Sequence, residues 1–147
     1  MRRRLLPALA LVLTAATAWA GLSPDTEQAL KDAKFVYIQS QRKSGEFGKP
    51  AEIWFFFENG AVYVGTRPTS WRVKRIKAGH AKARIAVGSA TGPTFEATGS
   101  LSTDGTIQQH LLEAYAKKYP ERWEDFEAGF RDGFKSGDRI LVKYKPN

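Results

Sequence analysis

The fold depends most on the segment Ala51–Thr66, which reads AEIWFFFENGAVYVGT. It is rich in aromatic and β-branched residues, which predicts one strand over residues 51–57 and another over residues 61–66. Residues 58–60, Glu-Asn-Gly, separate the two strands, and an Asn-Gly pair between apolar runs is typical of a β-hairpin turn. The sequence therefore predicts an antiparallel hairpin near the middle of the chain.

The first strand of this hairpin is apolar on both faces. Ile53, Phe55 and Phe57 alternate with Trp54 and Phe56, so the first three can face a core while the other two point the opposite way. Such a strand leaves an exposed apolar patch unless another element covers it. We expect a second copy of the chain to cover it in a homodimer. Cover by the C-terminal helices of the same chain is the alternative.

The elements around the hairpin predict a closed sheet with added helices. Further strands are expected at residues 35–39, 81–87, 94–101 and 139–144. Helices are expected from Pro24 to about Lys34, from Thr69 or Ser70 to Lys77, from Asp104 onward, and from about Glu121 to Lys135. The last of these carries an aromatic stripe that we interpret as core: Trp123, Phe126, Phe130 and Phe134. The expected class is α+β, mostly β, with six strands.

The first twenty residues have the pattern of a cleaved secretory signal peptide. Three arginines precede a short apolar run, and Ala18-Trp19-Ala20 forms a small-x-small cleavage site. The run is shorter than the roughly 20 residues of a membrane-spanning helix, so we expect no stable anchor after cleavage. The sequence predicts a periplasmic or secreted bacterial protein with one domain over residues 21–147. The Arg-Arg-x-Leu-Leu order also leaves twin-arginine export open beside the general route.

The net charge of +8 is concentrated in one part of the sequence. No carboxylate occurs between Glu58 and Glu96, a window that holds seven cations: Arg67, Arg72, Lys74, Arg75, Lys77, Lys82 and Arg84. At its centre, residues 66–72 (TRPTSWR) join a strand end to a helix start, where hydroxyl and guanidinium groups can converge on a phosphate. A solvated basic face is the alternative interpretation. We expect no nucleic-acid partner, because the protein is expected to be exported.

Several classes of active site are disfavoured by composition. The 147-residue chain has no Cys, which excludes disulfides, thiolate metal sites and a Cys nucleophile, and we expect no bound metal. Only two histidines are present, and neither lies in a nucleophile motif, which disfavours a hydrolase.

The stretch from Phe35 to about Leu101 resembles the pyridoxamine 5′-phosphate oxidase-like flavin-binding split β-barrel proteins and their deazaflavin-dependent nitroreductase relatives. The resemblance is carried by the QRKSG turn at residues 41–45, by the GKP triplet at 48–50, and by YVGT at 63–66 followed by SWR at 70–72. It implies a six-stranded antiparallel split β-barrel with a short helix after the third strand and two C-terminal helices before the last strand. Members of this group usually bind their cofactor at a dimer interface.

The resemblance also implies a flavin site. By position, Thr66, Arg67, Ser70 and Arg72 are expected to hold the phosphate of FMN, and Trp54 to border the flavin ring or a hydrophobic substrate. The second strand, Ile53-Trp54-Phe55-Phe56-Phe57, has no basic residue where the oxidases of this group place further phosphate ligands.

The leading functional hypothesis is an exported flavin-binding oxidoreductase that uses FMN, with a deazaflavin coenzyme as the alternative. A flavin carries out the redox chemistry itself, so no acid–base pair needs to be visible in the sequence. A second hypothesis is a non-catalytic module that binds a small molecule, flavin or haem, with His80 or His110 as an axial ligand. A third is a split barrel that has no cofactor and serves as a structural partner.

Overall fold

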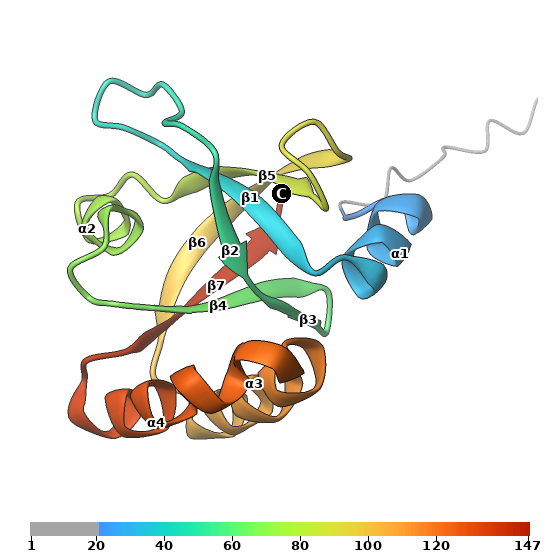
Figure 1. Ribbon diagram of the computed structural model, residues 1–147. Helices are drawn as coiled ribbons and strands as arrows, with labels where there is room; N and C mark the ends of the chain where they lie inside the picture. The colour runs from blue at the N-terminus through green and yellow to red at the C-terminus, as the bar shows by residue number, and fades with distance from the viewer. Residues whose placement is uncertain (1–20) are drawn as a thin grey trace, which may run out of the picture.

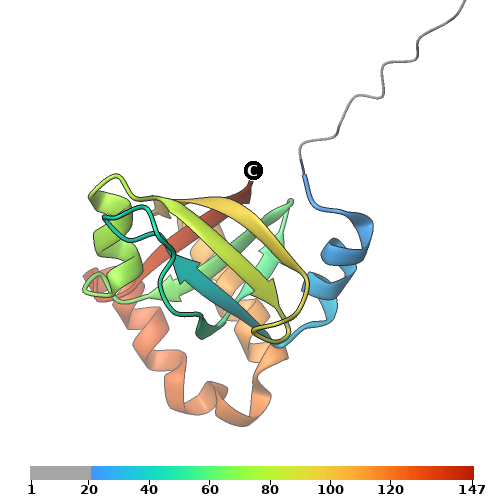
Figure 2. The same cartoon turned by 90° about the horizontal axis from the view of Figure 1, so that it is seen from above.

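A computed structural model describes residues 21–147 of the chain, and the expected signal peptide, residues 1–20, lies outside these described residues. Seven antiparallel strands form one curled, nearly closed sheet in the order β2-β1-β5-β6-β7-β4-β3. Helix α2 lies at one end of the curled sheet, α1 lies at the other end, and α3 and α4 pack together against one side (Figures 1 and 2). The elements are α1 (Pro24–Asp32), β1 (Phe35–Ser40), β2 (Ala51–Trp54), β3 (Phe56–Glu58), β4 (Ala61–Thr66), α2 (Trp71–Lys77), β5 (Lys82–Val87), β6 (Thr94–Ser102), α3 (Gly105–Lys118), α4 (Pro120–Ser136) and β7 (Ile140–Pro146).

The predicted α+β class and the antiparallel barrel are confirmed, and the strand count is seven rather than six. The additional strand arises because the segment predicted as one strand over residues 51–57 is divided at Phe55. β2 pairs with β1, with Trp54 opposite Phe35, whereas β3 pairs with β4, with Phe56 opposite Tyr63. β2 and β3 are the two ends of the strand order, so one continuous segment joins both edges of the sheet and brings the curl close to closure.

The backbone at this division bonds to side chains of the α3 helix and its C-cap instead of to a neighbouring strand. The Phe55 N–H donates to the Tyr119 hydroxyl (3.1 Å), which itself donates to the Lys34 carbonyl (2.6 Å). The Tyr115 hydroxyl donates to the carbonyl of Trp54 (2.9 Å) and accepts from the N–H of Gly65 (3.4 Å). Buried backbone groups need such partners, so these two hydroxyls replace strand-to-strand bonds where β2 and β4 separate.

The alternation of faces predicted for this segment is also present. Phe55 lies in the core inside the barrel, with Ile53 and Phe57 packed around that core. Phe56 and Trp54 lie on the outer side, in a second core formed with aromatic residues of α3 and α4. The outer face is therefore covered within one chain. The structure does not support the expectation that a second copy of the chain is needed to cover this face. The homodimer stays a prediction, which now rests on the family resemblance.

The predicted helix boundaries agree closely with the structure. The Ser23 hydroxyl caps α1 by accepting from the Thr26 N–H, and the Asp104 carboxylate accepts from the first free N–H groups of α3. Gly137 ends α4 with φ of +85°, a conformation that glycine adopts without strain. No helix within residues 21–147 combines the length and apolar character needed to cross a membrane.

A substitution at Tyr119 tests whether its hydroxyl stabilises the division of the strand at Phe55. Tyr119→Phe keeps the aromatic ring but leaves the buried Phe55 N–H without its partner, so we expect the free energy of unfolding to fall by about 1–3 kcal/mol. Urea denaturation measures this change. Tyr37→Phe is the matched control, because the Tyr37 hydroxyl is bonded to Glu52 at the surface of the same sheet. If the free energy of unfolding fell by the same small amount in both variants, this would contradict the role assigned to Tyr119.

Candidate functional site

A hollow of about 370 Å³ lies where β4 leads into α2, facing the loop between β1 and β2. Four cations and no carboxylate are among the residues that line it, which are Ile38, Ser40, Arg42, Gly48, Lys49, Ala51, Thr66, Ser70, Trp71, Arg72 and Arg75. Three of the five predicted site residues, Thr66, Ser70 and Arg72, meet there. We call this region the basic hollow.

The loop between β1 and β2 contributes residues that the sequence analysis did not assign to the site. Gly48 bonds back to the Ser40 carbonyl through its N–H (2.9 Å), which folds the loop against the end of β1. A Cβ at Gly48 would lie 3.1 Å from Arg75 Nη1 and 3.6 Å from Arg42 Nε, so glycine leaves room for two guanidinium groups. The QRKSG motif at residues 41–45 contains Arg42, and the stretch without carboxylates between Glu58 and Glu96 contains Arg75. Neither pattern could show that the two side chains meet.

Two side-chain donors on residues that line the basic hollow are buried and have no hydrogen-bond partner within the described part of the chain. They are Ser70 Oγ and Arg72 Nη1. Ser70 precedes α2, yet its side chain makes no capping bond, so the hydroxyl is not used by the helix. No carboxylate among residues 21–147 forms an ion pair with Arg72, and a buried, unpaired polar or charged group is costly. An anion in the hollow would supply the missing acceptors.

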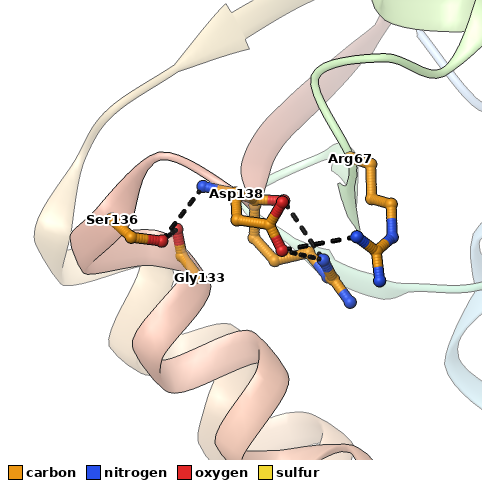
Figure 3. Close-up of polar contacts among 5 residues, drawn as sticks. Arg67, Gly133, Ser136 and Asp138 are labelled. Atoms are coloured by element: carbon orange, nitrogen blue, oxygen red, sulfur yellow. Dashed lines mark hydrogen bonds and ion pairs between the residues drawn. The ribbon is translucent and has the colours of Figure 1, made fainter.

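Arg67 lies apart from the basic hollow. Its Nη1 is 3.4 Å from the carboxylate of Asp138, and both side chains are exposed. Figure 3 shows this pair, with Asp138 held on its other side by Arg139 and by the Ser136 hydroxyl. The structure therefore does not bring Arg67 together with Ser70 and Arg72.

Trp54 also lies elsewhere, on the outer side of the sheet. Its ring stacks on Tyr119 with centroids 4.2 Å apart and meets Phe126 edge-on at 5.3 Å. It lines a separate hollow of about 320 Å³, and half of the residues that line this hollow are aromatic. The aromatic residue at the basic hollow is instead Trp71, whose side chain is 69% exposed and is flanked by Lys74 and Arg75.

Solved structures with the same arrangement of strands and helices are known, although no protein family and no curated protein matches the sequence. A candidate pyridoxamine 5′-phosphate oxidase from Listeria innocua superposes with a TM-score of 0.59 at 13% identity, covering 84% of this chain and 91% of that one. The haem storage protein HutZ from Vibrio cholerae gives 0.59 at 13% identity, with 86% and 91% covered. A candidate 5-nitroimidazole antibiotic resistance protein from Bacteroides thetaiotaomicron gives 0.60 at 11% identity, with 85% and 80% covered.

This chain has the split β-barrel fold. The fold predicted from the resemblance is thus confirmed, and at these identities the comparisons concern the fold alone. Within it, β2 has no basic residue, as the sequence shows. The four cations of the basic hollow come from the loop before β2 and from α2.

A second polar hollow of the split barrel, about 480 Å³, lies between α1, β3 and α3. His110 Nδ1 is 2.9 Å from the Glu58 carboxylate, and this hydrogen bond raises the pKa of His110. Lys118 Nζ donates to the Phe55 carbonyl (2.8 Å), and burial lowers the pKa of Lys118 to about 8. Among residues 21–147, no three His, Asp or Glu side chains are grouped as metal ligands.

Lys118 makes the stability of the fold depend on pH. The unfolded chain keeps the Lys118 proton up to a pKa of 10.5, and the folded chain only up to about 8. Between these values the unfolded state binds more protons, so the free energy of unfolding should rise from about pH 8 to about pH 10. Burial raises the pKa of Tyr115 and of Tyr119, which reverses the trend at higher pH.

Urea denaturation across this pH range measures the slope. Lys118→Met should remove the rise, whereas Lys117→Met, at the neighbouring position that lines the same hollow, should retain it. A slope that is unchanged in Lys118→Met would show that another group causes it.

Proposed function

We propose that this split barrel is a flavin-binding, oxidoreductase-like protein that holds the phosphate of FMN in the basic hollow. The proposal rests above all on one observation: Ser70 Oγ and Arg72 Nη1 are buried donors without acceptors, in a hollow lined by four cations and no carboxylate. A phosphate group carries the charge and the acceptor oxygens that these donors lack. A deazaflavin coenzyme, which also carries phosphate, is the alternative ligand.

The residues of the basic hollow fit the phosphate end of such a cofactor. Arg72 would supply a charge-assisted hydrogen bond, Ser70 and Thr66 would offer hydroxyls, and Arg42 and Arg75 would close the other side. When bound, the flavin would supply hydride or electron transfer. Arg67 and Trp54 are left out of this arrangement, because they lie in other parts of the structure.

We further propose that a second copy of the chain completes the site. Trp71 stands exposed at the edge of the basic hollow, and a planar ring bound beside it would be open to solvent in a single chain. A homodimer that covers this edge would shield the ring. The pattern of residues 1–20 supports export, and we propose a periplasmic or secreted location.

Arg72 and Arg67 provide a matched test of this function. Arg72→Ala should weaken FMN binding by about 1.5–3 kcal/mol, because it removes a charged donor to the phosphate, and Ser70→Ala should have a smaller effect in the same direction. Arg67→Ala also removes one positive charge, but from the exposed ion pair with Asp138, so it should leave the affinity for FMN unchanged. Flavin fluorescence titration measures all four proteins.

Two results would contradict the proposal. One is a colourless wild-type protein whose melting temperature responds neither to FMN nor to a deazaflavin coenzyme. The other is equal loss of affinity in Arg72→Ala and Arg67→Ala, which would indicate that general surface charge attracts the ligand.

A second candidate function is non-catalytic haem binding, and the His110–Glu58 pair favours it. A carboxylate on Nδ1 fixes the orientation of an imidazole and makes its Nε2 a better metal ligand, an arrangement common around metal-bound histidines. His110 lines the hollow of about 480 Å³, whereas His80 follows the end of α2 and lines neither this hollow nor the basic hollow.

Haemin titration separates this candidate from the flavin proposal. If the protein binds haem through His110, His110→Ala should abolish the shift of the Soret band, and Glu58→Gln should reduce the affinity by about tenfold. His80→Ala is the control and should behave as the wild type. Identical spectra for the wild type and His110→Ala would exclude His110 as the ligand.

A further inference from the structure

The hollow of about 480 Å³ between α1, β3 and α3 contains a lysine that the flavin proposal does not use. Lys118 lines this hollow from the C-terminal end of α3, and its side chain is half-buried. Its Nζ donates to the Phe55 carbonyl at 2.8 Å and lies 3.5 Å from the centre of the Phe55 ring. No carboxylate within residues 21–147 forms an ion pair with Lys118. The amino group is therefore held in one place, against an aromatic ring and beside an open space.

These surroundings make Lys118 a better nucleophile than an ordinary lysine near neutral pH. Only the neutral amine has a lone pair that can attack an electrophile. Burial lowers the pKa of Lys118 from 10.5 to about 8, so at about pH 7.5 its neutral fraction is on the order of 100 times that of an ordinary lysine. The bond to the Phe55 carbonyl uses one N–H, so the lone pair of the neutral amine stays available.

The other charged side chains of the hollow favour a ligand with a negative group. They are Lys31 of α1, Glu58 of β3, and His110, Glu113 and Lys117 of α3. Both carboxylates have partners, since Glu58 bonds to His110 and Glu113 accepts from the Gln109 amide. Lys31 and Lys117 take part in no ion pair among residues 21–147. These two cations can attract an anionic group into the hollow that holds the amine.

We propose that Lys118 forms an imine with a small carbonyl compound that carries a carboxylate, such as an aldehyde acid, bound in this hollow. The neutral amine attacks the carbonyl carbon, and one of its protons passes to the carbonyl oxygen. A further proton from solvent lets this oxygen leave as water. The product is a protonated imine, and nothing is oxidised or reduced in the step.

The contacts of Lys118 suit this product. A protonated imine keeps one N–H, which can still donate to the Phe55 carbonyl, and it keeps a positive charge, which the Phe55 ring stabilises. Lys31 and Lys117 would hold the carboxylate of the ligand. The site is separate from the basic hollow, so this inference does not depend on flavin binding.

Reductive trapping tests the inference. The purified protein is incubated at about pH 7.5 with glyoxylate, which is an aldehyde acid, and with sodium cyanoborohydride, which reduces an imine to a stable secondary amine. Peptide mapping by mass spectrometry then gives the modified fraction of each lysine. We expect Lys118 to be labelled about tenfold faster than Lys117, the adjacent lysine of the same hollow, because more of Lys118 is neutral.

A second aldehyde tests the preference for a carboxylate. Glycolaldehyde is similar in size to glyoxylate but uncharged, and Lys135, which is exposed on α4, is the internal reference for both reagents. The ratio of labelling at Lys118 to labelling at Lys135 should be several-fold higher with glyoxylate. A double variant, Lys31→Gln with Lys117→Gln, should make the two ratios equal.

Lys118→Arg is the control for the adduct and for the fold. Arginine keeps a positive charge and an N–H donor for the Phe55 carbonyl but forms no imine under these conditions, so the adduct at this position should be lost. The other lysines should be labelled as in the wild type, and the affinity for FMN should not change.

The inference is overturned if Lys118 of the wild type is labelled no faster than Lys117, a result that needs no variant to fold. Equal ratios for the two aldehydes in the wild type would also overturn it, because the amine would then react without the proposed ligand preference. Neither result bears on the flavin proposal, which the FMN titrations test separately.

Discussion

The structure depends on how the backbone around Phe55 is satisfied. At this residue the chain leaves one edge of the sheet and joins the other, so its N–H and carbonyl lose the partners that a regular strand would offer. Tyr119 and Lys118 bond to these two groups, and Tyr115 bridges Trp54 to Gly65 on the facing strand. A buried backbone group without a partner costs free energy comparable to a lost hydrogen bond. The C-terminal part of α3 is therefore required for the barrel to come close to closure at this point.

The same division determines where a ligand could bind. Because the segment 51–58 crosses between the edges, the end of β4 and the start of α2 come to face the loop that precedes β2. This brings together arginines from two distant parts of the chain, Arg42 and Arg72, without a carboxylate among the lining residues. The concentration of positive charge thus has a structural location. Of the three buried side-chain N and O atoms that have no partner within residues 21–147, two belong to residues that line this hollow.

The fold alone does not select a function for this protein. Its structural neighbours have been described as a candidate oxidase, a haem storage protein and a candidate resistance protein. One scaffold commonly carries unrelated chemistries, so the function has to be argued from individual sites. Two sites with different donors are present here, the basic hollow and the hollow that holds the His110–Glu58 pair. The ligands that we propose for them differ: a phosphate ester in the first and a metal-centred group in the second.

Local sequence determined the elements of this protein. The Asn-Gly turn, the alternation along residues 51–57 and the capping residues Ser23 and Asp104 each act on neighbours a few positions away, so their effect could be predicted. The division of the first hairpin strand at Phe55 could not be predicted, because the alternation is the same for one strand or two. The cover of the outer face by the helices, and the separation of Arg67 from Arg72 although they are five positions apart, also became visible only in the fold. These outcomes depend on partners that are remote in sequence. The Gly65 N–H donates to Tyr115, fifty positions away, and Arg67 pairs with Asp138. No local pattern contains that information, since it arises only when the strands have paired.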